Sequence, residues 1–237
     1  MISGFGGSYC GPASDAATWL ARWNPDPALL ACLVLAAALA WRLPRGRRDA
    51  GLATAAVAAV VFVSPLCALS VALFAGRAVH HLLLVAVAAP LAAIAWPPRR
   101  APGVAPALAI ASGVLWAWHL PLLYDAALEN MALYWLMQAS LLGSAWAYWA
   151  AIRAASPAGA LAGIAAGAGQ MGLLGAILTF APRPLYAAHL LTTAGFGLGP
   201  LADQQFAGLV MWVPGLIPYA IAGGLLASRR WRAMAGA

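Results

Sequence analysis

Long apolar stretches separated by short polar ones fill most of the chain. The apolar stretches cover residues 28–42, 51–70, 78–97, 104–122, 131–152, 158–181 and 207–227, and clusters of Pro and Arg interrupt them. Several approach or exceed the ~20 apolar residues that a helix needs to cross a bilayer. A transmembrane barrel would instead show short segments of alternating polarity. The pattern therefore predicts an all-α fold, a polytopic transmembrane bundle of about seven spans.

Composition agrees with a chain that lives in a lipid bilayer. Of its 237 residues, 64% are hydrophobic and 8% are charged. A soluble domain has roughly 45–50% apolar and about 25% charged residues. The net charge of +7 comes from arginines in short loops between the expected spans. That placement is typical of a membrane protein, so no nucleic-acid partner is expected.

The arginines also predict the orientation in the membrane. Alternate loops hold ten of the 13 basic residues, and these are Arg42, Arg45, Arg47, Arg48, Arg99, Arg100, Arg153, Arg229, Arg230 and Arg232. Because cytoplasmic loops carry the excess of Arg and Lys, the N-terminus is expected outside and the C-terminus in the cytoplasm. The chain then divides into an outer segment 1–27, a seven-span membrane domain 28–228 and a basic tail 229–237.

Groups capable of metal chemistry gather at the expected outer face. All four histidines (His80, His81, His119, His189) and all three cysteines (Cys10, Cys32, Cys67) are placed near it. Imidazole and sulfur ligands suit copper, and soft ligands select Cu(I). The candidate metal ligands are therefore His81 and His119, with Cys67 and Asp203 as third and fourth groups.

Each candidate also has a structural interpretation. His80 and His81 lie about 100° apart around a helix, so one of them is expected to be structural. Cys67 suits the role of a small buried apolar residue, and Asp203 suits a cap at the start of the last span. The cysteines include no CxxC pair and do not suggest a disulfide framework. No hydrolase, phosphate-binding or dinucleotide motif is present, so an enzyme is not expected.

Two further features bear on packing. Gly163 and Gly167 form a GxxxG step, which allows close helix contact. Packing within the chain is favoured there over dimerisation. The connection from Pro182 to Phe206 is the longest on the outer side, and its Pro, Gly and aromatic residues predict a re-entrant or interfacial lid.

Several stretches together resemble a known family. They are Ser64-Pro65-Leu66, Val79-His80-His81-Leu82 through Ala89-Pro90-Leu91, Trp118-His119-Leu120-Pro121 through Leu128, and Asp203-Gln204-Gln205 through Met211-Trp212-Val213-Pro214-Gly215. The chain is similar to the polytopic CtaG family of cytochrome c oxidase assembly factors. The resemblance implies a multi-pass protein of the bacterial plasma (inner) membrane. Its partners would be cytochrome c oxidase subunits or other assembly factors.

The chain departs from the family pattern at three positions. The resemblance leads one to expect a His-x-x-x-His pair at the start of the third span and often a second in the fifth. Arg77 stands in the first pair, leaving His81, while Tyr134 and Gln138 stand in the second. Such i, i+4 pairs share one helix face. Arg77 adds a fixed positive charge that disfavours a bound cation.

Three hypotheses follow. The first is an assembly factor that assists copper-site maturation or stabilises the nascent haem-copper oxidase at the outer leaflet. The second is a structural scaffold without metal, favoured by Arg77, Tyr134 and Gln138. The third is a b-type haem protein, because two histidines on facing helices can bind haem axially.

Overall fold

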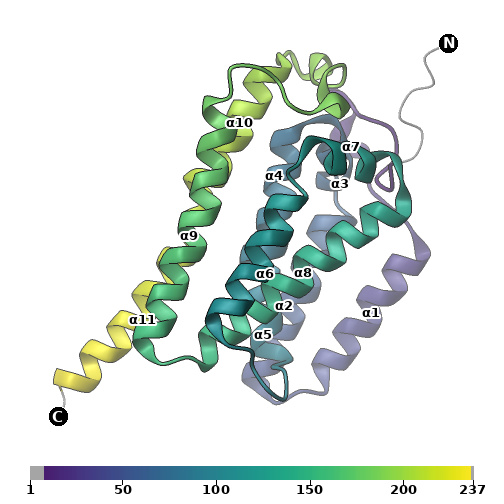
Figure 1. Ribbon diagram of the computed structural model, residues 1–237. Coiled ribbons are helices and arrows are strands. Elements are labelled where there is room, and N and C mark those ends of the chain that lie inside the picture. The colour runs from purple at the N-terminus through teal and green to yellow at the C-terminus, as the bar shows by residue number, and fades with distance from the viewer. Residues whose placement is uncertain (1–7, 236–237) are drawn as a thin grey trace.

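The protein is a bundle of helices, shown as a computed structural model in Figure 1. Residues 8–235 are described, except for the side chains of Arg229, Arg230, Ala233 and Ala235. The expected outer segment and basic tail therefore lie partly outside the described residues. The helices are α1 (Pro27–Trp41), α2 (Arg45–Phe62), α3 (Leu66–Ala72), α4 (Phe74–Leu82), α5 (Ala89–Ala95), α6 (Val104–Ala117), α7 (Pro121–Glu129), α8 (Met131–Ala154), α9 (Pro157–Phe180), α10 (Pro200–Trp212) and α11 (Ile217–Ala235).

Three helical stretches in the described part are long and apolar enough to cross a membrane. They are Phe74–Ala95, Pro157–Phe180 and Pro200–Ser228. The number rises to five if each of two bent pairs is one span, α2 with α3 at 45° and α6 with α7 at 72°. The all-helical membrane fold is thus confirmed in this coarser form. Seven spans and their orientation remain predictions.

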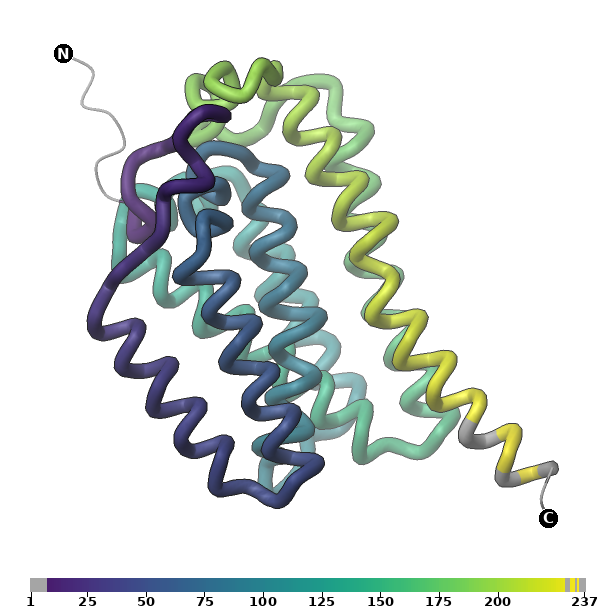
Figure 2. The backbone as a smooth tube through the Cα atoms, turned by 180° about the vertical axis from the view of Figure 1, so that it is seen from behind, coloured from purple at the N-terminus to yellow at the C-terminus, as the bar shows by residue number. Residues whose placement is uncertain are grey.

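The two ends of the bundle differ in chemistry. The α1–α2, α5–α6 and α8–α9 connections lie together at one end, and the 181–199 connection lies at the other with the described start of the chain (Figures 1 and 2). The first group of connections and the adjoining helix ends contain the seven arginines from Arg42 to Arg153 other than Arg77. We call this the arginine-rich end, and the opposite one the histidine end.

The stretch from α4 to α5 is one long helix with a wide turn inside it. Residues Leu83–Ala88 (η2) form a π-helix, which ends as the Ala89 N–H donates to the Leu84 carbonyl. Pro90 follows at once, and a proline within a helix removes an N–H and crowds the carbonyl four residues earlier. The Trp149 indole of α8 donates to the Val85 carbonyl at 3.0 Å. A side chain thus satisfies a backbone group inside the bundle.

Two expected boundaries are wrong. The lid from Pro182 to Phe206 is shorter, because Pro200 starts α10 and the chain from 181 to 199 contains only 3₁₀ turns at Ala187–His189 and Thr193–Phe196. Pro is favoured at the first position of a helix, where its missing N–H costs no hydrogen bond. The expected span 51–70 also bends, because α2 ends at Phe62 and Pro65 precedes α3.

The glycine step in α9 packs within the chain, as expected. A Cβ placed on Gly163 would lie 2.5 Å from the Ile152 side chain of α8, and one on Gly167 would lie 2.5 Å from the Tyr148 hydroxyl. The Tyr148 hydroxyl also donates to the Gly163 carbonyl at 3.0 Å. The glycines therefore let α8 and α9 approach each other.

Candidate functional site at the histidine end

A disulfide bond joins the start of the chain to the bundle. Cys10 and Cys67 are bonded, with their Cα atoms 5.3 Å apart, within the usual range for a disulfide. The expectation of three unpaired cysteines is therefore wrong, and Cys67 has no free thiolate for a metal in this state. The spacing of the cysteines in the sequence did not indicate this bond, because the segment before α1 folds back onto Cys67, which lies 57 positions after Cys10. Cys32 is free and exposed.

Asp203 caps a helix, although not its own. It lies in the first turn of α10 and is fully buried. Its carboxylate accepts the Phe74 N–H at 2.7 Å and the Ala75 N–H at 3.1 Å, at the start of α4. These amides have no partner inside their own helix, and the positive end of the helix dipole favours the carboxylate. Asp203 thus fixes α10 to the helix that carries Arg77, His80 and His81.

His81 and His119 do come together. Their ring centroids are 6.1 Å apart, and the rings are edge to face at 76°. His119 follows the end of α6, and its Nδ1 lies 2.7 Å from the Leu115 carbonyl, which leaves Nε2 for another partner. Neither ring nitrogen of His81 has a hydrogen-bond partner in the described part of the chain. His80 instead packs edge to face on Phe62, at 5.2 Å between centroids.

The four predicted ligands do not form one site. His81 and His119 are adjacent, but the Cys67 sulfur is bonded to Cys10 and both Asp203 oxygens accept amide hydrogens. Among the described residues there is no group of three or more His, Cys, Asp or Glu side chains arranged to hold a metal. The residues therefore fit a two-histidine site at most.

Arg77 lies at the centre of this region. It is 1% exposed, and its guanidinium carbon lies 5.4 Å from the centre of the Tyr134 ring. Arg77 and His81 share one face of α4, while Tyr134 and Gln138 share one face of α8. Tyr134 and Gln138 are buried as well. We call these four residues and His80 the polar chamber.

Aromatic side chains and a loop close the chamber toward the histidine end. The Tyr124 hydroxyl lies 2.7 Å from His189 Nε2, and the Tyr186 hydroxyl donates to the His119 carbonyl at 2.9 Å. Asp125 of α7 accepts the Ala187 and Ala188 N–H groups. Burial lowers the pKa of His189 to about 3, helped by the positive charge of Arg77. No motif in the sequence identified Tyr124 or Tyr186, because the loop contacts join residues more than 60 positions apart.

The segment before α1 adds a second cover. Tyr9 stacks on Tyr134 at 5.3 Å between centroids, and its hydroxyl donates to Asp26 at 2.6 Å. That hydrogen bond lowers the pKa of Asp26, which also caps α1 through the Ala28 N–H. The Cys10 Sγ lies 3.5 Å from the Tyr134 hydroxyl. The disulfide therefore holds this segment against the same tyrosine that faces Arg77.

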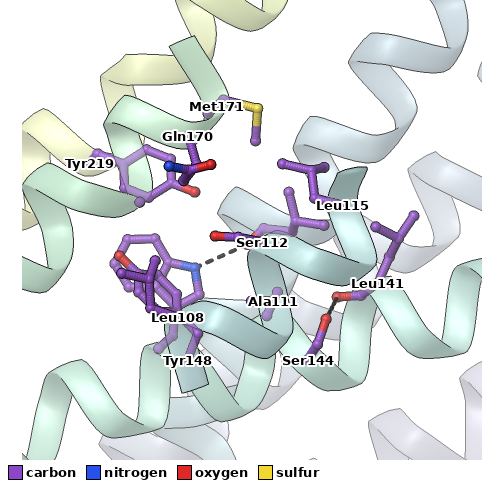
Figure 3. Close-up of a pocket in the computed structure, with 14 residues that line it drawn as sticks. Leu108, Ala111, Ser112, Leu115, Leu141, Ser144, Tyr148, Gln170, Met171 and Tyr219 are labelled. Atoms are coloured by element: carbon purple, nitrogen blue, oxygen red, sulfur yellow. Dashed lines mark hydrogen bonds between the residues drawn. The ribbon is translucent and has the colours of Figure 1, made fainter. Parts of the chain in front are cut away.

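A separate pocket lies among α6, α8, α9 and α11 (Figure 3). It measures about 40 Å³, and its polar lining residues include Ser112, Ser144, Tyr148, Gln170 and Tyr219. Gln170 already accepts the Trp116 indole N–H at 3.0 Å. This volume has room for roughly three water molecules, and none of the predicted ligands lines it.

A protein-family model matches the chain. No curated protein and no solved structure matches the chain. The family model of the cytochrome c oxidase caa3 assembly factor (Caa3_CtaG) matches residues 99–233, more than half of the chain. His119 and Asp203 lie inside the matched range, and Arg77 and His81 lie before it. The chain belongs to the family of cytochrome c oxidase caa3 assembly factors.

Proposed function

We propose that this protein assists assembly of a caa3-type cytochrome c oxidase without catalysing a reaction, by stabilising the nascent oxidase in the membrane through direct contact at the histidine end. Family membership supports the assembly role. One observation favours contact over metal chemistry: Cys67 and Asp203 are engaged elsewhere, and Arg77 lies buried beside His81. A fixed positive charge at that position opposes a bound cation.

The histidine end faces the outside of a bacterial plasma membrane in this proposal, with seven spans between the two faces. Two independent features support this orientation. The arginines gather at the opposite end, as expected for the cytoplasmic side. The Cys10–Cys67 disulfide lies at the histidine end, and disulfides persist in oxidising compartments such as the periplasm.

Transfer of Cu(I) as cargo is the second candidate mechanism, supported by the His81–His119 pair. Two imidazoles that bind one metal at ~2.0 Å have ring centroids roughly 6 Å apart, close to the 6.1 Å found here. Copper would then be held by His81 and by Nε2 of His119. The haem alternative remains a prediction of the sequence, and the absence of a Soret band in purified protein would exclude it.

Complementation of a strain that lacks this protein tests the assembly role. The measurement is caa3 oxidase activity and oxidase copper content in isolated membranes, with wild type, His81→Ala/His119→Ala and His80→Ala variants. His80 is the matched control, because it is equally buried but faces Phe62. Unchanged oxidase in the strain without the protein would disprove the assembly role.

The double variant separates the two mechanisms. Contact predicts that it restores oxidase activity and copper content as well as His80→Ala does. Copper transfer predicts an oxidase that is made but lacks copper, and wild-type protein that binds Cu(I) stoichiometrically after anaerobic loading while the double variant does not.

A further inference from the structure

Arg77 is a buried cation that forms no ion pair with any described side chain. Its Nε, Nη1 and Nη2 atoms make no well-aligned hydrogen bond to a described residue, although the side chain is 1% exposed and the Tyr124 and Tyr134 hydroxyls lie near it. It lies in the first turns of the membrane-spanning stretch Phe74–Ala95. An unpaired charge in such a place costs several kcal/mol, which makes it a candidate for function.

No carboxylate of a described residue lies within ion-pair distance of Arg77. Among the side chains that the structure describes, the one ion pair within 4 Å joins Arg48 and Asp49 at the arginine-rich end. Asp203 is bound to the amides at the start of α4, and Asp125 is bound to those of Ala187 and Ala188. The Tyr134 ring offers a cation–π contact at 5.4 Å, and the Tyr124 and Tyr134 hydroxyls lie near the guanidinium, but these neutral groups leave its positive charge uncompensated.

On the helix of Arg77 and on the helix of Tyr134 lie hydrogen-bonding groups that have no partner among the described residues. Both nitrogens of His80 and of His81, and both polar atoms of the Gln138 amide, make no hydrogen bond to any residue that the structure describes. His81 is one turn from Arg77 on α4, and Gln138 is one turn from Tyr134 on α8. Guanidinium, imidazole and amide groups all supply N–H donors. A fixed positive charge amid such donors suits an anion.

We propose that Arg77, with Gln138 and His81, binds one small monovalent inorganic anion of the chloride class inside the bundle. Small size follows from burial, because the five residues of the polar chamber are at most 3% exposed. The covers formed by Tyr9 on Tyr134, by the Cys10–Cys67 disulfide and by the Tyr124–His189 pair exclude a carboxylate on a partner protein. The anion neutralises Arg77 and joins α4 to α8.

Thermal unfolding of the full-length protein in detergent tests this site. The protein is purified in gluconate, an anion much larger than chloride, and sodium chloride then replaces sodium gluconate at constant ionic strength. The apparent melting temperature, followed by tryptophan fluorescence, is expected to rise and saturate. At ~100-fold excess over Kd the rise should be roughly 5–10 °C. A flat response would mean that water alone solvates Arg77 and would overturn the proposal.

Two variants show whether Arg77 is responsible. Arg77→Gln is expected to lose the saturable rise. Arg99→Gln is the matched control, since it removes an exposed arginine at the other end of the bundle, and should keep it. An equal chloride response in Arg77→Gln and wild type would overturn the assignment.

A direct binding measurement on wild-type protein tests the proposal even if the Arg77→Gln protein does not fold. Equilibrium dialysis of wild-type protein with radiolabelled chloride should find one saturable ion per chain, and unlabelled bromide should displace it while gluconate does not. Absence of saturable binding would overturn the proposal whatever the variant does.

Discussion

The α9–α10 contact and the space between α4 and α8 are packed in opposite ways. Between α9 and α10 the backbones touch: a Cβ on Gly175 would lie 2.8 Å from the Gly208 carbonyl oxygen and 2.9 Å from the Trp212 nitrogen. Between α4 and α8 lie long polar side chains, with Arg77 over Tyr134. The first region has no room for a side chain, and the second has polar groups that no described residue pairs. Rigid packing and candidate chemistry are thus separated within one bundle.

Gly175→Val should have the largest effect of the changes considered. The added side chain meets backbone atoms of α10, which cannot rotate away, so α9 and α10 must separate. Overpacking of this kind typically costs 1–3 kcal/mol and can cost more, and we expect a loss of about 4 kcal/mol in unfolding free energy. Detergent melting curves measure it. Gly169→Val on the same helix is the control, because a Cβ on Gly169 would meet no neighbouring element within 4 Å. Equal losses in both variants would show that the close contact is not what matters.

Cys10→Ser tests whether the disulfide that holds the first segment over Tyr134 stabilises the protein. It removes a cross-link between residues separated by 57 positions, and loss of such a constraint should cost roughly 3 kcal/mol. The melting temperature should fall, and reductant should lower that of wild type but not that of the variant. Cys32→Ser is the control, because Cys32 is free and exposed. A variant as stable as Cys32→Ser would contradict a stabilising role for the disulfide.

The sequence predicted the helices and their close packing better than it predicted the contacts of the polar side chains. Apolar length and glycine spacing predicted the helices and the packing of Gly163 and Gly167 within the chain. Topology also brought His81 next to His119. The contacts of Cys67 and Asp203 could not be predicted, because each joins segments remote in sequence. Asp203 carries the pattern of an N-cap, yet its carboxylate lies at the start of a different helix.

His189 should make the stability of the folded protein sensitive to acid. Burial lowers its pKa to about 3 in the folded protein, whereas an unfolded histidine titrates near 6.5. The unfolded state therefore takes up the proton first, and stability falls as pH drops from about 6.5 toward 3. The slope is at most ~1.4 kcal/mol per pH unit for this group. Melting curves from pH 7 to pH 5.5 should fall more steeply for wild type than for His189→Gln.

Tyr124→Phe is the control for that pH dependence. It removes the hydroxyl 2.7 Å from His189 Nε2 but leaves the buried imidazole in place. The variant should be less stable at every pH and keep the steep slope. A His189→Gln protein with the slope of wild type would assign the acid sensitivity to other groups.

Trp149→Phe should have the smallest effect on stability. It tests the hydrogen bond between α8 and the π-helical turn that follows α4. The indole donates to the Val85 carbonyl in the π-helical turn before Pro90. Phenylalanine keeps most of the ring but leaves this buried carbonyl without that donor, at a cost of about 1 kcal/mol. The melting temperature should fall by roughly 2–4 °C. Trp146→Phe is the matched control on the same helix, because its indole donates to the Trp96 carbonyl near the arginine-rich end, where water can replace it. A larger fall in melting temperature for Trp149→Phe than for Trp146→Phe would mean that α8 stabilises the π-helical turn Leu83–Ala88. The helix that carries Arg77, His80 and His81 would then depend on the hydrogen bond that Trp149 makes at this turn.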